Sequence, residues 1–504
     1  MNIEPSFRAF EEKYLAGQAQ VAWTTLVADL ETPVSAMLKI ANGLQNSFLL
    51  ESVEGGASRG RYSIIGLRPD VIWRCNGNQA EINYTADRDS EAFQACDQKA
   101  LDSLRELVEA SRIDLPEHLP PMAAGLVGYL GYDTVALMED IPSTRPDALG
   151  TPDGLFIRPT IMTIFDLVKD TVIIVTPIRF DQSMTPQVAF DAAQNRLQDV
   201  VVDFDNKLPH QETGIGATSL HAPISNTPDD RYKEIVRKAK EYIFAGDIFQ
   251  VVLSQRFRIP FKLPPFSLYR ALRRTNPSPF LFFLNFGDFS VVGSSPEILI
   301  RLRDGKVTLR PLAGTRPRGA SSAEDNALAE ELLSDEKECA EHLMLLDLGR
   351  NDVGRVAKIG SVKVTEKMVI ERYSHVMHIV SNVEGEIDDV HDAIDALAGG
   401  FPAGTVSGAP KIRAMEIIDE LETEKRGIYA GTVGYFSANG SMDTCIVLRT
   451  AIVKDETMYV QSGAGIVADS NPDAEHQECI NKAQALVRAA QEAVRYADES
   501  GNQL

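Results

Sequence analysis

The chain has 504 residues, more than one simple hydrophobic core usually holds, so its length predicts two or more domains. Hydrophobic residues make up 44% and charged residues 24%, which is typical of a soluble globular protein. The formal net charge of −22 argues against a nucleic acid or an anionic membrane as the main partner, although a local cluster of Arg and Lys can still bind a small anion.

The cysteines and the hydropathy pattern predict a cytoplasmic protein. The five cysteines are sparse, odd in number and without Cys-x-x-Cys spacing, as expected of reduced thiols. The N-terminal segment carries acidic residues and no apolar stretch of a secretory signal. The sequence contains no run of about 18 apolar residues, so no membrane-spanning segment is expected.

Residues 1–205 alternate short apolar runs with turn residues and form the first expected region. Enrichment in β-branched residues between Gly, Asp and Pro predicts strands at 47–50, 60–66, 71–75 and 171–176, and helices are expected at 100–111 and 186–204. The following stretch is polar and without periodicity, which predicts a linker at residues 206–228.

The pattern changes at Asp229, where a second region, residues 229–498, begins. We expect helices at 229–245, 335–347 and 472–495, and strands at 249–258, 280–285, 290–292 and 297–302. Asp335 is an expected N-cap, and Asn471 with Pro472 begins the last helix. Strands outnumber helices, so the expected class is α+β, with antiparallel β-sheets packed as a sandwich and helices on the outside.

Two pairs of glutamates have helical spacing. Glu338 and Glu341 are three residues apart, as are Glu475 and Glu478, so each pair shares a helix face. If both pairs face one cavity, four carboxylates require a cation, and oxygen ligands without a Cys/His set favour Mg²⁺. Alternatively, Glu338 closes a capping box with Asp335, and the other glutamates stabilise helix N-termini and the surface.

Two basic residues near the C-terminus could bind an anion. Arg449 lies in the segment 442–450, a predicted strand whose apolar neighbours would shield the guanidinium. A buried Arg needs an anion, either a ligand carboxylate or the carboxylate of a structural ion pair. Lys482 follows Glu478 by four residues on the same helix face, where it could pair with that glutamate or bind a substrate carboxylate.

Two glycine-rich segments could bring backbone N–H groups close to a ligand. Gly463 and Gly465 flank Ala464 after a predicted strand, although most such loops are plain turns. The signature segment, residues 402–411, reads Pro-Ala-Gly-Thr-Val-Ser-Gly-Ala-Pro-Lys and has almost no side chain that could build a core.

The signature segment and the segment 335–352 resemble motifs of the chorismate-utilising enzymes, and the resemblance covers most of the chain. It is strongest to the anthranilate synthase component I branch. The resemblance implies that Glu341 and Glu478 bind Mg²⁺ against a substrate carboxylate, with Glu475 at the metal site and Glu338 in the surrounding water and polar contacts. The resemblance also implies that chorismate is bound by Gly314, Thr315, Tyr429, Arg449, Gly463, Ala464, Gly465 and Lys482.

The same resemblance implies catalytic roles for Glu338, His378 and Thr405. Thr405 contacts the substrate. His378 either assists departure of the C4 hydroxyl of chorismate or orients that group. The ordinary pKa of a histidine, about 6.5, suits proton transfer at neutral pH.

The residues at two positions distinguish family members that catalyse different reactions. Members that add water carry a lysine base where this chain has Gln250, and aminodeoxychorismate synthases carry an attacking lysine where this chain has Ala313. The chain is therefore expected to convert chorismate and ammonia through 2-amino-2-deoxyisochorismate to anthranilate and pyruvate, the first step of tryptophan biosynthesis.

Four alternatives remain open. Two are family members: aminodeoxychorismate synthase component I and an enzyme that stops at the amino intermediate. The third is an inactive regulatory subunit that binds tryptophan. The fourth is an unrelated Mg²⁺-dependent phosphoryl enzyme, which would need a phosphate-binding loop of a kind that the sequence lacks.

The resemblance also implies feedback inhibition by L-tryptophan through the N-terminal region. The residues expected to bind tryptophan are Glu51, Ser52, Pro279, Phe280, Leu281 and Tyr435. The alternative is that residues 49–52 only end a strand. No cysteine lies in a Gly-x-Cys-x-Gly elbow, so ammonia is expected to be free or to come from a separate glutamine amidotransferase subunit, component II, in a heterotetramer.

Overall fold

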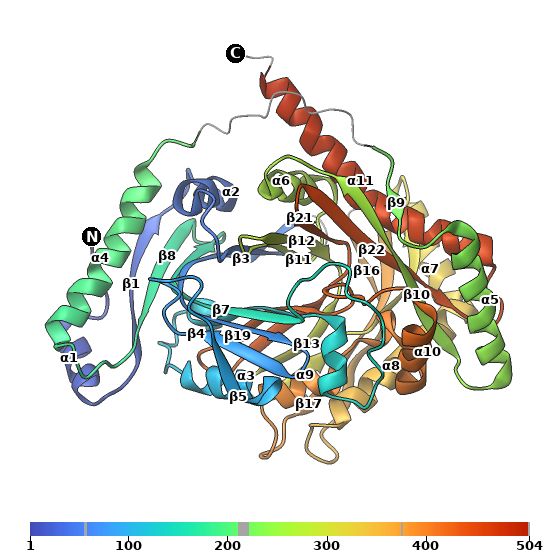
Figure 1. Cartoon of the computed structure of the whole chain (residues 1–504), viewed down its shortest axis with the longest axis horizontal. Coiled ribbons are helices and arrows are strands. Elements are labelled where there is room, and N and C mark those ends of the chain that lie inside the picture. Colours follow the sequence, from blue (N-terminus) through green and yellow to red (C-terminus); the bar gives the residue numbers. More distant parts are fainter. Residues whose placement is uncertain (55–57, 210–220, 374–375, 502–504) are drawn as a thin grey trace.

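A continuous antiparallel sheet, which branches into two sheets that share two strands, lies at the centre of the molecule with helices on the outer faces (Figure 1). The computed structural model describes all residues except 55–57, 210–220, 374–375 and 502–504. Residues 210–220, in the middle of the expected linker, lie outside the described ones. The expected class, an α+β sandwich with outer helices, is confirmed.

The first sheet contains strands from both halves of the chain. Its strand order is β1-β8-β7-β3-β2-β11-β12-β21-β22-β10. In that order the strands are β1 (Gln20–Val27), β8 (Thr171–Ile178), β7 (Gly154–Asp166), β3 (Ser58–Asn76), β2 (Ser47–Glu54), β11 (Phe280–Asn285), β12 (Phe289–Ser295), β21 (Thr450–Lys454), β22 (Thr457–Ile466) and β10 (Gln250–Pro260). Two short strands, β9 (Ile224–Ser225) and β18 (Gly408–Ala409), also pair with β10.

The second sheet shares β3 and β7 with the first. Its order is β5-β4-β3-β7-β6-β19-β20-β13-β14-β17, and both β15 and β16 pair with β17. The additional strands are β4 (Gln79–Asn83), β5 (Gln94–Lys99), β6 (Gly125–Leu130), β13 (Ile298–Arg303), β14 (Lys306–Leu309), β15 (Leu312–Pro317), β16 (Lys363–Arg372), β17 (Val376–Glu386), β19 (Thr432–Ser437) and β20 (Met442–Ile446). A register shift between Pro69 and Val71 lets β3 pass from one sheet to the other.

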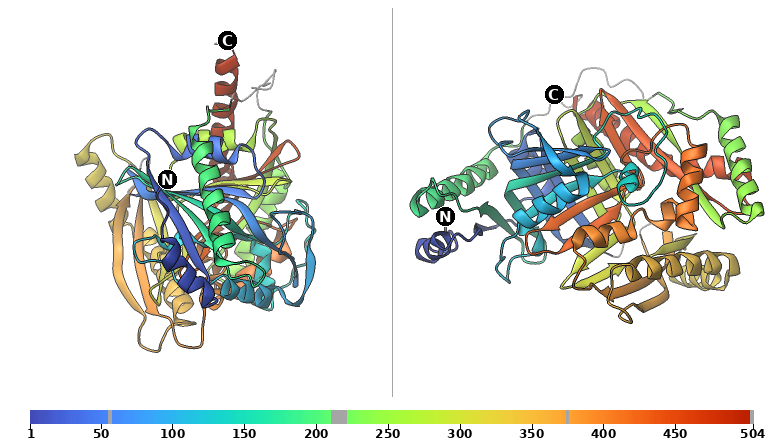
Figure 2. Two further views of the ribbon diagram at one scale, coloured as in Figure 1. Left: turned by 90° about the vertical axis from the view of Figure 1, so that its left-hand side faces the viewer. Right: turned by 60° about the horizontal axis from the view of Figure 1, so that its bottom comes forward.

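Apolar side chains fill three layers. One cluster, with Phe48, Val127, Phe282 and Val433, lies between the sheets. A second joins the first sheet to α1, α4, α6 and α11, and a third joins the second sheet to α3, α8, α9 and α10. Figure 2 shows helices along the outside of the sheets. The helices are α1 (Phe7–Leu15), α2 (Pro33–Ala36), α3 (Ala100–Ala110), α4 (Pro186–Asp205), α5 (Asp229–Ala245), α6 (Pro265–Thr275), α7 (Ser322–Ser334), α8 (Glu336–Gly354), α9 (Ala393–Gly400), α10 (Lys411–Leu421) and α11 (Pro472–Gly501), with short helical turns at Met37–Ala41, Pro121–Ala123, Tyr132–Leu137 and Gly404–Val406.

The two expected regions are joined through the sheets. β2 pairs with β11 over Ser47–Ser52, and β6 pairs with β19, so residues 1–205 and 229–498 contribute to both sheets. A boundary at residues 206–228 remains a prediction. No helix of the described residues is long and apolar enough to cross a membrane.

Candidate active site

A cavity of about 640 Å³ lies where α8 and α11 face the ends of β10, β15 and β22. Its size suits a small-molecule ligand. The predicted site residues that line it are Gly314, Thr315, Glu338, Glu341, His378, Thr405, Tyr429, Arg449, Gly463, Gly465, Glu475, Glu478 and Lys482. Ala464 is fully buried and belongs to the apolar core instead.

Each of the two acidic helices begins at a side-chain cap. Asp335 accepts hydrogen bonds from the backbone N–H groups of Lys337 and Glu338 at 3.0 and 3.2 Å. Asn471 accepts in the same way from the first turn of α11. Both expected N-caps are confirmed. The Glu338 carboxylate accepts from Arg316 at 3.2 Å, so a contact with β15 takes the place of a capping box.

The carboxylates of the two helices repel one another across the cavity. Burial raises the pKa of Glu341, and the negative charges of Glu338 and Glu478 raise it further, against the hydrogen bond from Gln250. Burial also raises the pKa of Glu475, and Glu478 adds to that shift. Glu338 pairs with Arg316 at 3.2 Å and Glu478 with Lys482 at 2.7 Å, whereas Glu341 and Glu475 have no ion-pair partner among the described residues. The acidic wall therefore carries negative charge that the chain does not neutralise.

The donor set fits a divalent cation bound together with a ligand. Among the described residues, no three His, Cys, Asp or Glu side chains lie close enough to form a metal site alone. Carboxylate oxygens in excess are nevertheless what Mg²⁺ prefers, and Mg²⁺ usually takes only one or two protein carboxylates and fills its other positions with water or substrate oxygens. The unneutralised acidic wall is the observation that supports such an ion here.

His378 on β17 is held by its Nδ1 atom. That atom lies 2.9 Å from the Thr315 hydroxyl and 3.2 Å from the Gly314 carbonyl oxygen. An N–H at Nδ1 donates to the carbonyl and leaves Nε2 as an acceptor. Burial lowers the pKa of His378 to about 4, and the nearby Arg449 charge contributes. The imidazole is therefore neutral at physiological pH in the absence of a ligand.

Glu297 is a cavity residue that the sequence analysis missed. It precedes β13, its side chain is buried, and it lines the cavity beside Thr405. Burial raises its pKa to about 8, although the Thr405 hydroxyl and a backbone N–H partly oppose the shift. At neutral pH this carboxyl is protonated and can donate a proton. The motif Ser-Ser-Pro-Glu could have drawn attention to it, but the sequence alone indicated only the start of a strand.

Arg449 gives the cavity a positive end, although the strand predicted around it is wrong. β20 ends at Ile446 and β21 begins at Thr450, and Arg449 between them has a φ of 48°. Burial lowers the pKa of the guanidinium. Among the described residues no carboxylate forms an ion pair with it, so the structural ion pair considered from the sequence is not found and the guanidinium remains available to a ligand.

The Gly463–Gly465 segment is strand and not loop, which corrects the sequence interpretation. These residues continue β22 opposite Leu253 of β10. One edge of β22 pairs with β10 along its length. The other edge pairs with β21 only as far as Val460, so beyond Val460 this free edge of β22 faces the cavity. A Cβ on Gly465 would lie 2.7 Å from the Gln250 amide nitrogen, which explains the absence of a side chain there.

The signature segment packs tightly between β10 and α8. Gly408 has a φ of 143°, and a Cβ there would lie 2.2 Å from the Gln250 carbonyl oxygen. A Cβ on Gly404 would lie 2.2 Å from Leu348 of α8. This close approach places Thr405, whose buried hydroxyl has no geometrically ideal hydrogen bond, against the cavity.

The residues expected to bind tryptophan lie in two places. Ser52 is opposite Phe280, and Glu51 is opposite Leu281, in the pairing of β2 with β11. Pro279 lines a second cavity of about 300 Å³, which shares His378, Arg449 and Lys482 with the main one. Tyr435 lies on β19 of the other sheet, where its hydroxyl accepts from Arg303 at 3.5 Å, and it belongs to the same apolar cluster as Phe280.

Comparisons with known proteins agree with this geometry. Residues 47–488 match the family described as chorismate binding enzyme. The chain is 57% identical to anthranilate synthase component 1 of Cereibacter sphaeroides over 99% of both chains, and 48% identical to that of Pseudomonas aeruginosa over 97% of this chain and 98% of the relative.

Two solved structures are also similar. Anthranilate synthase component I from Streptococcus pneumoniae TIGR4 has a TM-score of 0.74 and 40% identity, covering 85% of this chain and 92% of that one. The menaquinone-specific isochorismate synthase MenF from Escherichia coli has a TM-score of 0.70 at 19% identity, covering 97% of this chain and 100% of that one, and shares the fold.

Proposed function

The chain belongs to the chorismate-binding enzyme family, and we propose that its main cavity converts chorismate and ammonia to anthranilate and pyruvate, the first step of tryptophan biosynthesis. The observation that carries the assignment is the cavity's division into an acidic wall and a basic end, in which Glu341, Glu475 and Arg449 have no ion-pair partner among the described residues. Chorismate has two carboxylates, and this cavity offers two different places to bind a carboxylate.

One carboxylate is held at the basic end. The Arg449 guanidinium can bind it through two parallel hydrogen bonds. Lys482, which also donates to the Gly463 carbonyl oxygen at 3.0 Å, lies on the same side as the free edge of β22. Tyr429 also lines this end, and its hydroxyl lies close to Gly463: a Cβ on Gly463 would be only 3.1 Å from it.

The second carboxylate lies against the acidic wall, where a cation is required. Glu341 and Glu478 would hold Mg²⁺, with Glu475 beside them and Glu338 in the surrounding polar contacts. When bound, Mg²⁺ supplies positive charge that neutralises the substrate carboxylate and fixes its position. With both carboxylates fixed, the ring cannot turn in the cavity. The reaction is faster because the reacting groups are held in the correct orientation.

Proton transfer at the leaving group is assigned to Glu297. Its carboxyl is protonated at neutral pH and lies in the cavity beside Thr405, so it can donate a proton to the departing C4 hydroxyl. His378 is neutral and carries its free lone pair on Nε2. This charge state favours the orienting role, in which Nε2 accepts a hydrogen bond from the substrate, over that of a proton donor. Thr405 contacts both Glu297 and the substrate.

Ammonia forms a bond to C2 of the ring while the C4 hydroxyl leaves with the proton from Glu297, and this attack needs no base to activate the nucleophile. Gln250 occupies the cavity wall and donates to Glu341 at 3.2 Å. An amide cannot abstract a proton from water, whereas ammonia attacks with its own lone pair. The relatives are named component 1, which implies a component 2, and we assign the supply of ammonia to a separate glutamine amidotransferase subunit in a cytoplasmic heterotetramer.

Tryptophan inhibition is assigned to the region around Ser52 and Pro279. Pro279 lies between β11 and the second cavity, which opens onto His378 and Arg449. A ligand bound against Ser52, Phe280 and Leu281 would therefore act on the wall next to the catalytic cavity.

The direct test incubates the purified chain with chorismate, Mg²⁺ and ammonium at mildly alkaline pH, with and without tryptophan. We expect anthranilate fluorescence and equimolar pyruvate, both suppressed by tryptophan. Mass analysis separates the family alternatives, because an amino-cyclohexadiene that accumulates without pyruvate would identify an enzyme that stops earlier or an aminodeoxychorismate synthase. Chorismate that remains unconsumed would overturn the proposal.

A further inference from the structure

A buried ion pair outside the cavity joins three of its walls. Arg426 and Glu422 follow α10, and their side chains are only 1% and 4% exposed. The guanidinium donates to both Glu422 carboxylate oxygens, at 3.0 Å from Nε and 2.6 Å from Nη2. Glu422 makes the pKa of Arg426 higher than usual despite burial. The Arg426 guanidinium therefore stays charged although it is buried.

The remaining donors of Arg426 reach two backbone segments that line the cavity. Nη1 donates to the Val406 carbonyl oxygen at 2.7 Å, within the signature segment directly after Thr405. Nη2 donates to the Val252 carbonyl oxygen at 2.7 Å, on β10. One guanidinium thus fixes the distance between the signature segment and the central strand.

The carboxylate of Glu422 reaches a third wall. It accepts from the Ser254 backbone N–H at 2.7 Å and from the Ser254 hydroxyl at 2.9 Å. The same hydroxyl accepts from the Gln461 side chain on β22 at 2.9 Å, and Gln461 lines the cavity. The pair therefore ties β22 and β10 together at the edge that faces the substrate.

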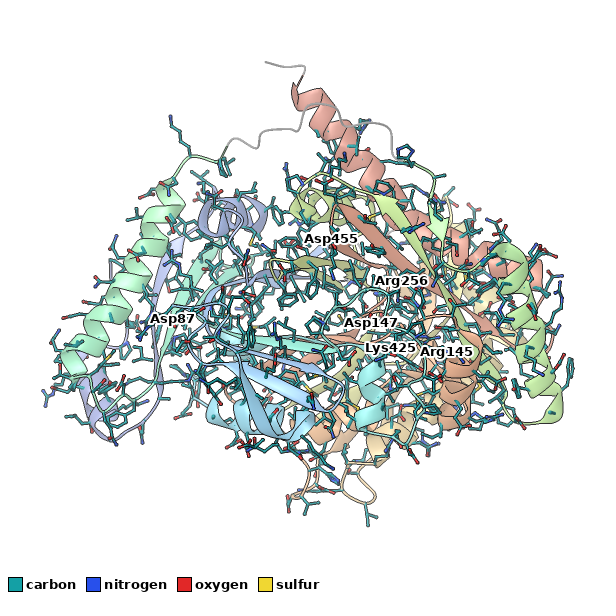
Figure 3. All side chains as sticks on the ribbon, viewed as in Figure 1. Asp87, Arg145, Asp147, Arg256, Lys425 and Asp455 are labelled. Atoms are coloured by element: carbon teal, nitrogen blue, oxygen red, sulfur yellow. The ribbon has the colours of Figure 1, made fainter. Side chains whose placement is uncertain are left out.

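Two aromatic rings lie near the Arg426 guanidinium, and Arg256 fixes the backbone of the same segment. It lies 4.6 Å from the ring centre of Tyr132 and 5.7 Å from that of Tyr429, which lines the cavity. Arg256 of β10 donates to the backbone oxygens of Lys425 and Arg426 and pairs with Glu424 at 3.0 Å. Figure 3 labels Arg256 and Lys425 in this region. The segment after α10 is thus fixed from both sides.

A buried charged pair is seldom a net source of stability, because removal of both charges from water costs about as much as their attraction returns. Its geometry can instead fix one arrangement of the segments around it. Resting on the proposed function, we propose that Arg426 and Glu422 are positioning residues that hold Thr405, Tyr429 and the free edge of β22 in the arrangement that binds and turns over chorismate.

The test compares the same substitution in two pairs of an arginine and a carboxylate, one fully buried and one partly buried. Arg426→Lys keeps the charge but loses the fork that spans Glu422, Val406 and Val252. Arg158→Lys is the control, since Arg158 is also buried and binds Asp70 through two hydrogen bonds, at 2.8 and 2.9 Å, remote from the cavity. Both variants lose thermal stability. Only Arg426→Lys lowers kcat/KM for chorismate per folded molecule, by about 10- to 100-fold, because small misplacements at a site have such effects.

A coupling measurement separates positioning from general destabilisation. If Arg426 acts through the signature segment, the effects of Arg426→Lys and Thr405→Ala on kcat/KM are not additive, whereas those of Arg158→Lys and Thr405→Ala are. If Arg426→Lys does not fold, Glu422→Gln replaces it in the test, because glutamine keeps the shape of the side chain. The effects of Glu422→Gln and Thr405→Ala on kcat/KM are then also expected to be non-additive.

The outcomes are distinct. Equal kcat/KM in Arg426→Lys and Arg158→Lys at matched folded fraction, or additive effects with Thr405→Ala, would show that the pair is merely structural and overturn the inference. An inactive wild-type chain would instead refute the proposed function itself.

Discussion

Some buried charges of the catalytic cavity have no partner in the chain, whereas the buried charge of Glu51 is fully paired. In the cavity, Glu341 and Glu475 have raised pKa values, and the buried Arg449 has no carboxylate partner among the described residues. Around Glu51 the chain supplies every partner: Arg273 donates at 2.5 and 2.8 Å, Tyr269 at 2.5 Å and Ser63 at 3.3 Å. Both regions are built on the same sheets, but only the catalytic cavity has unpaired charge that a ligand could neutralise.

The difference indicates how each region recognises its ligand. Unpaired buried charge is costly, so a ligand that neutralises it binds tightly. The cavity therefore selects by charge, in agreement with a metal and a dicarboxylate. At Glu51 a ligand ammonium would have to compete with Arg273, so recognition there depends more on the shape of the surface around Ser52, Phe280 and Leu281.

The largest effect is expected at the acidic wall. Glu478→Gln removes one charge and one proposed ligand of Mg²⁺, and turnover should fall roughly 10²- to 10³-fold, as when other groups that stabilise charge in an active site are removed. Glu336→Gln, on the exposed face of α8, is the control and should keep wild-type activity. Steady-state rates at increasing Mg²⁺ check this, and a Glu478→Gln variant with unchanged Mg²⁺ dependence would remove the metal assignment.

A somewhat smaller effect is expected for the proton donor. Glu297→Gln should lower kcat by about 100-fold, within the usual range for loss of a general acid. At a fixed concentration of free ammonia, the wild-type rate should fall as the pH rises through about 8, where Glu297 loses its proton. It should also fall on the acid side as Glu341 and Glu475, whose pKa values are raised, gain protons and no longer hold the cation. A pH–rate profile checks both limbs. An alkaline limb that persists unchanged in Glu297→Gln would exclude this donor.

These assignments show what the sequence could reveal and what it could not. The two glutamate pairs were visible because helical spacing is local, and the caps at Asp335 and Asn471 lie next to the helices that they begin. Glu297 and the Arg426–Glu422 pair were missed because their roles depend on strands far apart in the chain. Arg449 was placed in a strand because its neighbours are apolar, but its left-handed backbone conformation is set by the junction of β20 and β21.

At the Glu51 region we expect a change in regulation without a change in chemistry. Ser52→Phe would fill the surface opposite Phe280 where the indole ring is expected, so tryptophan should no longer inhibit, while turnover without tryptophan stays within about twofold of wild type. Dose–response curves with tryptophan measure this. A wild-type inhibition constant in the variant would contradict the placement of the site.

The smallest effect is expected at Tyr435. Its hydroxyl interacts weakly with Arg303 in the other sheet, so Tyr435→Phe removes little that a ligand near Ser52 could use. The inhibition constant should change by less than about threefold, since loss of one weak hydrogen bond costs no more than about 0.5 kcal/mol. A loss of inhibition equal to that in Ser52→Phe would show that Tyr435 contacts tryptophan directly.

The contrast between the two regions is tested most directly by one paired measurement. Glu478→Gln and Ser52→Phe are assayed side by side for anthranilate formation from chorismate, Mg²⁺ and ammonium, with and without tryptophan. The account predicts that Glu478→Gln forms almost no anthranilate under either condition, and that Ser52→Phe forms it at the wild-type rate under both. Tryptophan-sensitive activity in Glu478→Gln, or loss of basal activity in Ser52→Phe, would contradict the separation of a charge-selective cavity from a shape-selective regulatory surface.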